Sequence, residues 1–383
     1  MNNSPADPVI YLDYNATTPL DPRVAEAMLP FLERFFGNPS SSHAQGRAMR
    51  AAVDKARSQA AGLLGAEPEG IIFTSGGTEA NNHAILGAAV SRAHRGRHIV
   101  TSAVEHPAVN AVCHHLESLG FTTSYVPVDR MGRVDPEAVA KALTEETILV
   151  TLMHANNEVG TLQPVAEVAR LARARGILTH SDCAQSVGKV PVTLDLLGVD
   201  MISVAGHKLY APKGVGILCL GKGVELPPLM HGADHEAGRR PGTENILGIV
   251  GLGQACQLAE QELLQEESHL VDLRDRLQTG LLAAFPNSRV HGDPINRLPN
   301  TLSIGFPGAA AWEIMDNLPG VAVSAGAACH DGKTVGSQVL RAMGVDSDFA
   351  RGTLRISVGR MTTEAEIQPA LAAIVKAVKI SQK

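Results

Sequence analysis

Short apolar runs that alternate with helical patterns constrain the fold of this chain more than any other feature of its sequence. Seven runs rich in Val, Ile and Leu, bounded by Gly, Pro, Asn or Asp, follow one another between residues 70 and 220. Helical patterns separate several of them, as at 79–93 and 165–176. Near-continuous apolar strands joined by crossover helices are typical of a mainly parallel sheet covered on both faces. The sequence therefore predicts a large α/β domain built on a seven-stranded, mainly parallel sheet.

A different pattern follows this alternation. The charged stretch 258–285 keeps apolar residues at helical spacing, which predicts a long helix leading away from the large domain. Two further strand candidates, TLSIGF and TLRISVG, come after it together with two helical patterns. We expect a second, smaller α+β domain formed by residues 1–15 and 261–383, and a large domain formed by residues 16–260.

Composition excludes several classes of protein. The 383 residues include 33 basic and 39 acidic side chains, so the formal net charge is −6 and the chain lacks the basic footprint of a nucleic-acid-binding protein. No stretch approaches the roughly 20 apolar residues needed to span a bilayer, and we expect a cytoplasmic protein without a membrane partner. Five cysteines without a C-x-x-C argue against a disulfide framework and a zinc finger. His231 and His235 lack an H-E-x-x-H frame, so no metal site is expected.

Polar residues follow the predicted strands at the edge where an open α/β sheet binds its ligands. Lys208 comes directly after one apolar strand, Asp182 ends the preceding strand, and Gly76 and Gly77 lead from another strand into a helix starting near Thr78. A partly buried lysine can react with an aldehyde, an acid can keep a pyridine nitrogen protonated, and a glycine-rich helix start favours a phosphate. Each residue alone would be an ordinary cap, turn or surface residue. Their joint occurrence suits pyridoxal phosphate.

Three more residues at strand ends fit the same cofactor. His106 would stack on the pyridine ring, and Gln185 and Asn157 would donate hydrogen bonds to its phenolic oxygen. Each is individually unremarkable, because His, Asn and Gln at strand ends often satisfy backbone groups.

Ten motifs along the chain carry a family resemblance. In order they are YLDYNATTPLDPRV, FGNPSSSH, FTSGGTEANN, VEHPAV, MHANNEVGTLQP, SDCAQSVGKV, GHKLYAPKGVG, RPGTEN, SAGAACH and LRISVGR. They resemble the cysteine desulfurases of the NifS/IscS type, which belong to the class V aminotransferase family of fold-type I pyridoxal-phosphate enzymes. The similarity runs from about Tyr11 to the C-terminal helix, and the motifs keep the order of the family.

The resemblance implies roles for individual residues. Lys208 would hold the cofactor aldehyde, Asp182 would pair with the pyridine nitrogen and His106 would stack on the ring and move protons. Further cofactor contacts are implied for Gly77, Thr78, Asn157, Gln185, His207 and Thr243.

Two of the implied roles reach beyond the cofactor. Thr243 would contact the phosphate of a neighbouring subunit, which implies a homodimer. Arg355, with Asn157, would bind the carboxylate of the substrate, since a guanidinium can form two parallel charge-assisted hydrogen bonds.

Cys329 would carry the chemistry that distinguishes the family. It stands in a glycine-rich segment beside His330, where nearby positive charge favours a thiolate. The other cysteines, at positions 113, 183, 219 and 256, fit small buried side chains. The resemblance implies that L-cysteine is converted to L-alanine while Cys329 becomes a persulfide, which then passes sulfur to an acceptor such as an iron–sulfur scaffold protein.

Other functions stay open at this point. Ala205 stands where the family usually has Ser three residues before the lysine. This residue and the stretch SAGAACH also resemble selenocysteine lyases, so L-selenocysteine is an alternative substrate. A transaminase of the same fold would not need Cys329. A non-catalytic scaffold that binds a sulfur acceptor is a further alternative, although the reactive residues are intact.

Overall fold

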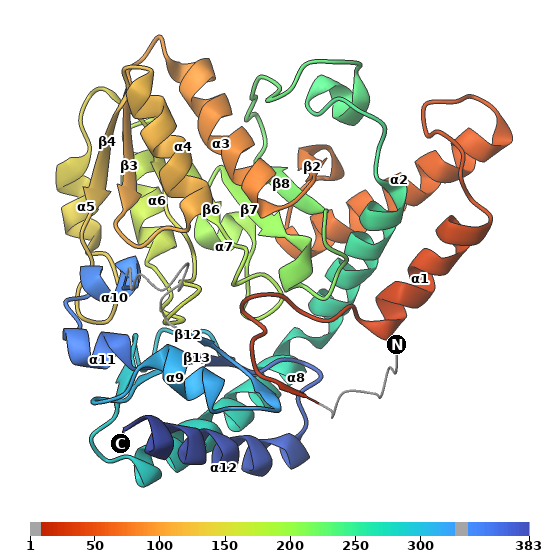
Figure 1. The fold of residues 1–383 in the computed structure, drawn as a ribbon. Helices are drawn as coiled ribbons and strands as arrows, with labels where there is room; N and C mark the ends of the chain where they lie inside the picture. Colours follow the sequence, from red (N-terminus) through yellow and green to blue (C-terminus); the bar gives the residue numbers. More distant parts are fainter. Residues whose placement is uncertain (1–8, 326–335, 383) are drawn as a thin grey trace.

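The computed structural model describes residues 9–325 and 336–382, and its largest element is a seven-stranded sheet (Figure 1). The strand order is β2-β8-β7-β6-β5-β3-β4, and β8 alone runs antiparallel to its neighbours. The predicted seven-stranded, mainly parallel sheet is confirmed. Its strands are β2 (Ile71–Thr74), β3 (His98–Ser102), β4 (Thr122–Val126), β5 (Thr147–Thr151), β6 (Leu178–Asp182), β7 (Met201–Ala205) and β8 (Gly216–Leu220).

Helices cover both faces of this sheet because successive strand residues point to opposite sides. In β8, Ile217 and Cys219 join one apolar core, whereas Leu218 and Leu220 join another. The second core is closed by α3 (Gly77–Arg92) and α4 (Pro107–Ser118). The first is closed by α1 (Pro22–Glu33), α2 (Ala44–Leu64), α5 (Pro136–Ala142), α6 (Val165–Arg173), α7 (Leu194–Leu197) and the start of α8 (Ile246–Ala284).

Helix α8 connects the large sheet to the smaller unit. It begins at Ile246, well before the stretch predicted from residue 258, because its first turns contain glycines that weaken the helical signal. These glycines are needed for packing: a Cβ on Gly253 would lie 2.6 Å from the Cα of Ala56 in α2, and one on Gly251 would lie 2.7 Å from the sulfur of Met28 in α1. The helix therefore packs closely on α2 and α1.

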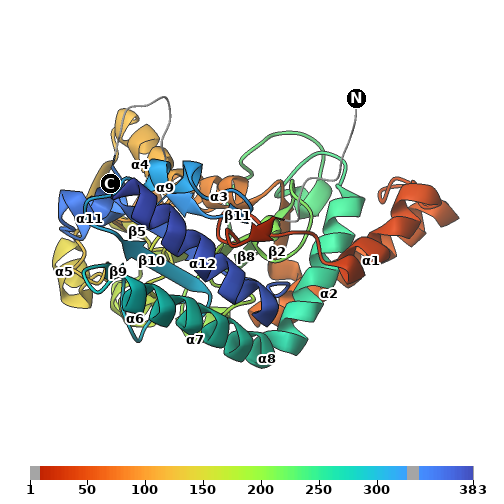
Figure 2. The same cartoon turned by 60° about the horizontal axis from the view of Figure 1, so that its bottom comes forward.

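The smaller unit packs a second sheet against helices. Strands β9 (Arg289–His291), β10 (Thr301–Gly305), β12 (Ser324–Ala325) and β13 (Thr353–Ser357) form an antiparallel sheet in the order β12-β13-β10-β9. The second half of α8 lies beside α12 (Glu364–Ser381), and both helices share an apolar core with this sheet (Figure 2). The remaining elements are β1 (Ile10–Tyr11), which pairs with β11 (Val321–Ala322), and the short helices α9 (Ala311–Asp316), α10 (Gln338–Ala342) and α11 (Ser347–Arg351).

The two units share α8 and the N-terminal segment. Residues of α8 up to Ala259 belong to the core of the large sheet, and those from Leu270 onward belong to the core of the smaller one. The helix is unbroken at residue 260, so the domain limits 16–260 and 261–383 stay a prediction. Among the helices within residues 9–325 and 336–382, none combines the length and the apolar character that a membrane crossing demands.

His180 gives the folded chain a defined sensitivity to acid. It lies in β6, fully buried between the hydroxyls of Thr151 (2.8 Å) and Ser203 (2.9 Å), and burial lowers its pKa to about 3. The unfolded chain takes up this proton below about pH 6.5, whereas the folded chain does not, so this histidine removes stability as the pH falls from about 6.5 towards 3.

We predict that His180→Gln makes the stability less dependent on pH. Urea unfolding of the wild type should show a falling free energy of unfolding between pH 7 and pH 5. The variant, although less stable at pH 7, should have a slope smaller by up to about 1.4 kcal/mol per pH unit. The exposed His115 provides the control, since His115→Gln should leave the slope unchanged. Identical slopes for wild type and His180→Gln would contradict the prediction.

Candidate active site

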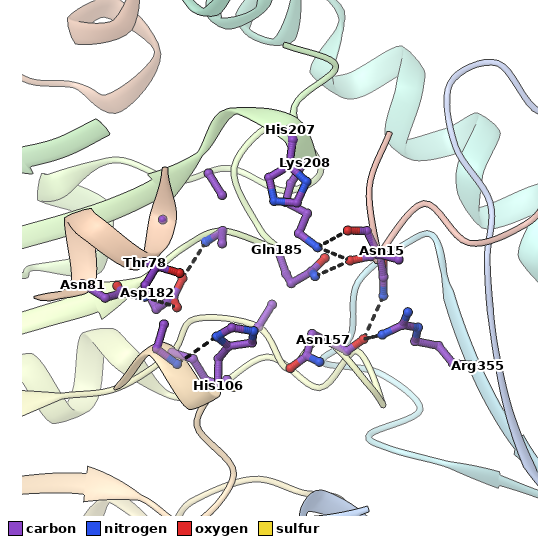
Figure 3. Close-up of a pocket in the computed structure, with 17 residues that line it drawn as sticks. Asn15, Thr78, Asn81, His106, Asn157, Asp182, Gln185, His207, Lys208 and Arg355 are labelled. Atoms are coloured by element: carbon purple, nitrogen blue, oxygen red, sulfur yellow. Dashed lines mark hydrogen bonds between the residues drawn. The ribbon is translucent and has the colours of Figure 1, made fainter. Parts of the chain in front are cut away.

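A cavity of about 410 Å³ lies between the carboxyl edge of the large sheet and β13 of the smaller one (Figure 3). It brings together most of the predicted site residues although they come from distant parts of the sequence. Thr243 lines a separate pocket with Ser75 and Arg240, and Cys329 lies outside the described residues. The predicted residues that line the main cavity are Gly77, Thr78, His106, Asn157, Asp182, Gln185, His207, Lys208 and Arg355.

Lys208 places a primary amine in the cavity. Strand β7 ends at Ala205 and a tight 3-10 turn over Gly206–Lys208 carries the lysine into the space beyond the sheet. Its Nζ donates hydrogen bonds to the backbone oxygens of Asn15 (2.5 Å) and Ala16 (2.7 Å). Burial, and then the positive charge of Arg355, lower the pKa of Lys208 to about 8. Near neutral pH a useful fraction of this amine is therefore unprotonated and nucleophilic.

Asp182 is a carboxylate held in one orientation. It ends β6, is 6% exposed, and accepts hydrogen bonds at both oxygens: 2.7 Å from Nδ2 of Asn81 and 2.9 Å from the backbone N–H of Ala184. Asn81 lies in α3 one turn after Thr78 and was not among the predicted site residues. The sequence feature that could have identified Asn81 as a site residue was its position in the FTSGGTEANN motif. The carboxylate faces a ligand from a fixed direction, which suits pairing with a ring N–H.

His106 is the N-terminal cap of α4, and this role fixes its proton. Its Nδ1 accepts a hydrogen bond from the backbone N–H of Ala108 at 3.1 Å. Burial lowers the pKa of His106, the charge of Asp182 opposes this shift, and the charge of Lys208 adds to it. A neutral imidazole whose Nδ1 accepts must carry its proton on Nε2. The ring can therefore stack on a ligand and offer an N–H at Nε2.

The start of α3 offers hydrogen-bond donors to an anion. Gly76 precedes the helix without a side-chain cap, so the first backbone N–H groups and the positive end of a 16-residue helix face the cavity near Thr78. A Cβ on Gly77 would lie 3.1 Å from the Cβ of Ala205, so glycine lets the helix approach β7 closely. His207 adds a neutral donor, because burial and then Lys208 lower its pKa to about 4.

Arg355 brings a guanidinium from β13 to the opposite side of the cavity. One terminal nitrogen donates to Oδ1 of Asp13 at 2.8 Å, and the other donates to the backbone oxygen of Asn157 at 3.2 Å. The side chain is 9% exposed, and its Nε is buried without a hydrogen-bond partner within residues 9–325 and 336–382. Because Arg355 lines the cavity, its positive charge favours an acidic ligand group there.

Asn15 joins these residues and was missed by sequence reasoning. Its backbone oxygen accepts from Lys208 and from Nε2 of Gln185 (2.9 Å). Its side-chain Nδ2 donates to Oγ1 of Thr301 at 2.8 Å, and its Oδ1 accepts from Asn300 at 3.0 Å. Asn15 therefore links the N-terminal segment and the large sheet to the smaller unit. Its presence in the YLDYNATTP motif was the only sequence signal, because bonds to residues so far along the chain leave no local pattern.

Comparison with known proteins places this arrangement in a family. The family model described as aminotransferase class-V matches residues 10–369. The chain belongs to the aminotransferase class V family. This class V chain is 46% identical over 360 residues to the protein named cysteine desulfurase IscS of Dictyoglomus turgidum, covering 94% of this chain and 91% of that protein. It is 47% identical over 361 residues to cysteine desulfurase NifS of Azotobacter vinelandii, covering 94% and 90%.

The fold of this class V chain also has solved counterparts. A structure titled NIFS-like protein superposes with a TM-score of 0.91 at 39% sequence identity, and the match covers 97% of this chain and all of that one. The predicted family and fold type are thus confirmed, and with them the smaller α+β unit beside the seven-stranded sheet.

We predict that Lys208 is the most reactive solvent-accessible lysine of this class V chain at pH 8. With a pKa of about 8, half of its side chains are neutral at that pH, roughly a hundredfold more than for an ordinary lysine with a pKa near 10.4. Reductive methylation of the ligand-free protein at increasing pH, followed by peptide mass spectrometry, should give a midpoint near pH 8 at Lys208. Arg355→Gln should raise this midpoint because it removes a nearby positive charge. A midpoint above pH 10 in the wild type would contradict the assignment.

Proposed function

We propose that this chain is a pyridoxal-phosphate-dependent cysteine desulfurase that converts L-cysteine to L-alanine and collects the sulfur on Cys329. The observation that carries the proposal is one cavity lined by a lysine amine of lowered pKa, a fixed carboxylate and a guanidinium. The relatives that cover most of the chain are named cysteine desulfurases, so selenocysteine lyase is not favoured.

The donor set of the cavity fits pyridoxal phosphate. Lys208 would hold the aldehyde, Asp182 would pair with the ring nitrogen, and the start of α3 with Thr78 and His207 would hold the phosphate. Ala205 contributes a methyl group and no hydroxyl here, so the phosphate would depend on backbone N–H groups and His207. His106 would stack on the ring, and Asn157 and Gln185 would contact the phenolic oxygen. When bound, the cofactor supplies an electron sink for the carbanion chemistry at the substrate Cα.

Three side chains of the chain would bind the substrate and transfer its protons. Arg355, which lines the cavity, would bind the substrate carboxylate through its guanidinium. Nζ of Lys208 would take the proton from Cα, for which its lowered pKa suits it near neutral pH. His106 would deliver or accept protons at Nε2 beside it.

Cys329 would perform the sulfur transfer. Its thiolate would form a bond to the sulfur of the substrate while the bond from that sulfur to Cβ breaks, with the electron pair leaving towards Cβ. Cβ then takes up a proton and Cα regains the proton that Lys208 removed, so the products are L-alanine and a Cys329 persulfide. A second thiolate on an acceptor protein, for which an iron–sulfur scaffold is the proposed example, would then receive the outer sulfur by the same exchange.

We further propose that the enzyme is a cytoplasmic homodimer. Thr243 is exposed and lies with Ser75, Arg240 and Asn245 in a pocket outside the main cavity. From there it would contribute to the phosphate site of a second copy of the chain.

Replacing Cys329 by Ser should stop sulfur transfer but still allow L-cysteine to react with the bound cofactor. We expect the variant to release less than about one hundredth of the wild-type sulfide from L-cysteine, since a hydroxyl cannot replace the thiolate as a nucleophile at neutral pH. L-Cysteine should nevertheless still change the absorption spectrum of the bound cofactor, because Lys208 and Arg355 are untouched. Undiminished sulfide release from Cys329→Ser would refute the assignment of the nucleophile, and a wild-type peptide that gains no sulfur mass on incubation with cysteine would do the same.

Replacing Arg355 by Gln should weaken substrate binding through the carboxylate. Charge-assisted hydrogen bonds contribute about 1.5–3 kcal/mol, so KM for L-cysteine should rise roughly 10- to 100-fold. Cysteamine, which lacks the carboxylate, should be a poor substrate whose KM changes less than about twofold. Arg355→Lys keeps the charge without the planar fork, so its KM for L-cysteine should lie between those of the wild type and of Arg355→Gln. Equal effects on both substrates would show that Arg355 does not bind the carboxylate.

A further inference from the structure

A second lysine is buried behind the cavity, in a place that the mechanism does not use. Lys189 lies in the turns that follow β6, is 4% exposed, and does not line the cavity. Its Nζ donates two hydrogen bonds of 3.1 Å, one to the backbone oxygen and one to the side-chain Oε1 of Gln185, four residues earlier. Both of its hydrogen bonds within the described part of the chain thus go to a single cavity residue.

Burial at this position is energetically unfavourable for a charged amine. Burial, and then the positive charge of Lys208, lower the pKa of Lys189 to about 7, and Arg355 lowers it further, whereas Glu266 raises it. Within residues 9–325 and 336–382 no carboxylate lies close enough to form an ion pair with it. An apolar side chain would fill the same space at a lower cost of desolvation. The amine therefore needs an explanation other than packing.

The hydrogen-bond chemistry around Gln185 supplies the explanation. In its protonated form Lys189 has donors only, so the atom of the Gln185 amide that then faces Lys189 must be the carbonyl oxygen, as observed. At the other end, the backbone oxygen of Asn15 is an acceptor, and it receives a hydrogen bond of 2.9 Å from Nε2 of Gln185. Both contacts select the same one of the two amide orientations, with the NH₂ group turned away from Lys189 and towards Asn15, which lines the cavity.

That orientation leaves a donor available. Nε2 carries two hydrogens, and one of them is taken by Asn15. Lys208 reaches the same backbone oxygen of Asn15, so the NH₂ group of Gln185 lies next to the reactive amine (Figure 3). A reversed amide would place a carbonyl oxygen against the oxygen of Asn15 and present an acceptor where the cofactor oxygen needs a donor.

We propose that Lys189 is a positioning residue that fixes the side-chain amide of Gln185, so that its NH₂ group serves as a donor to the phenolic oxygen of the bound cofactor. The inference rests on the proposed function, because it assumes that pyridoxal phosphate occupies the cavity. It adds to that function a buried residue outside the cavity that controls one contact to the cofactor.

The test is a double-mutant cycle on the full chain with pyridoxal phosphate as the probe. Cofactor-free wild type, Lys189→Met, Gln185→Ala and the double variant are titrated with pyridoxal phosphate, and the dissociation constant and the absorption spectrum of the bound form are recorded. Lys189→Met should weaken binding about tenfold and shift the absorption maximum, as expected for a lost hydrogen bond to the cofactor oxygen. In the Gln185→Ala background the same substitution should change the dissociation constant less than about twofold.

Two matched variants separate positioning from folding. Glutamine is nearly as large as methionine but keeps an N–H donor. The affinity and spectrum of Lys189→Gln should therefore lie closer to those of the wild type than the affinity and spectrum of Lys189→Met do. Arg274 is another buried cation. It donates a hydrogen bond to the backbone oxygen of Leu298, and neither residue lines the cavity. Arg274→Met should lower the thermal midpoint without changing the dissociation constant for pyridoxal phosphate.

Two results would overturn the role of Lys189. One is an equal loss of affinity from Lys189→Met with and without the Gln185 side chain, which would assign its effect to the backbone contact. The other is an unchanged affinity and spectrum in Lys189→Met. If this variant does not fold, the cycle is repeated with Lys189→Leu, which also lacks an N–H donor and to which the same criteria apply. A wild-type chain that takes up no pyridoxal phosphate would instead contradict the proposed function itself, and the inference with it.

Discussion

The common direction of neighbouring strands β7, β6, β5 and β3 is the constraint on which the site depends. Because these strands are parallel, their carboxyl ends meet at one edge, and the residues that follow them enter one space. Lys208 follows β7, Asp182 ends β6 and His106 follows β3. Each hydrogen-bonding ladder thus sets the position of one functional group relative to the next, and a flexible loop is not needed to bring them together.

Burial then sets the chemistry of the groups that the sheet has assembled. Lys208, His106 and His207 all have lowered pKa values, and in each case the largest cause is the loss of water around the charged form. Lys208 also acts on both histidines, because like charges in one cavity disfavour each other's protonation. Near neutral pH the cavity therefore contains two neutral imidazoles, one with its proton on Nε2 and one beside the anion site, and an amine of which only a fraction is unprotonated.

The sequence was sufficient for features with a local signal. Apolar runs predicted all seven strands of the large sheet, and the polar residues after them predicted most of the cavity. Features that depend on distant partners were not predicted: Asn15 bonds to Thr301, Asn81 bonds to Asp182, and Lys189 matters only through the orientation of Gln185. The early start of α8 was missed because its glycines weaken helix propensity while allowing close packing on α2. For Cys329, the sequence alone supports the assignment.

The link between the two sheets has a chemical consequence for the amine. Arg355 belongs to β13 of the smaller sheet, yet its charge is the second cause of the lowered pKa of Lys208 at the end of β7. Asp13 pairs with Arg355 at 2.8 Å and acts on Lys208 in the opposite direction. A carboxylate bound in the cavity beside Arg355 would add a second negative charge on this side and would favour the protonated amine. The position of the smaller sheet and the charge of the ligand therefore both set how readily Lys208 takes up or gives up a proton.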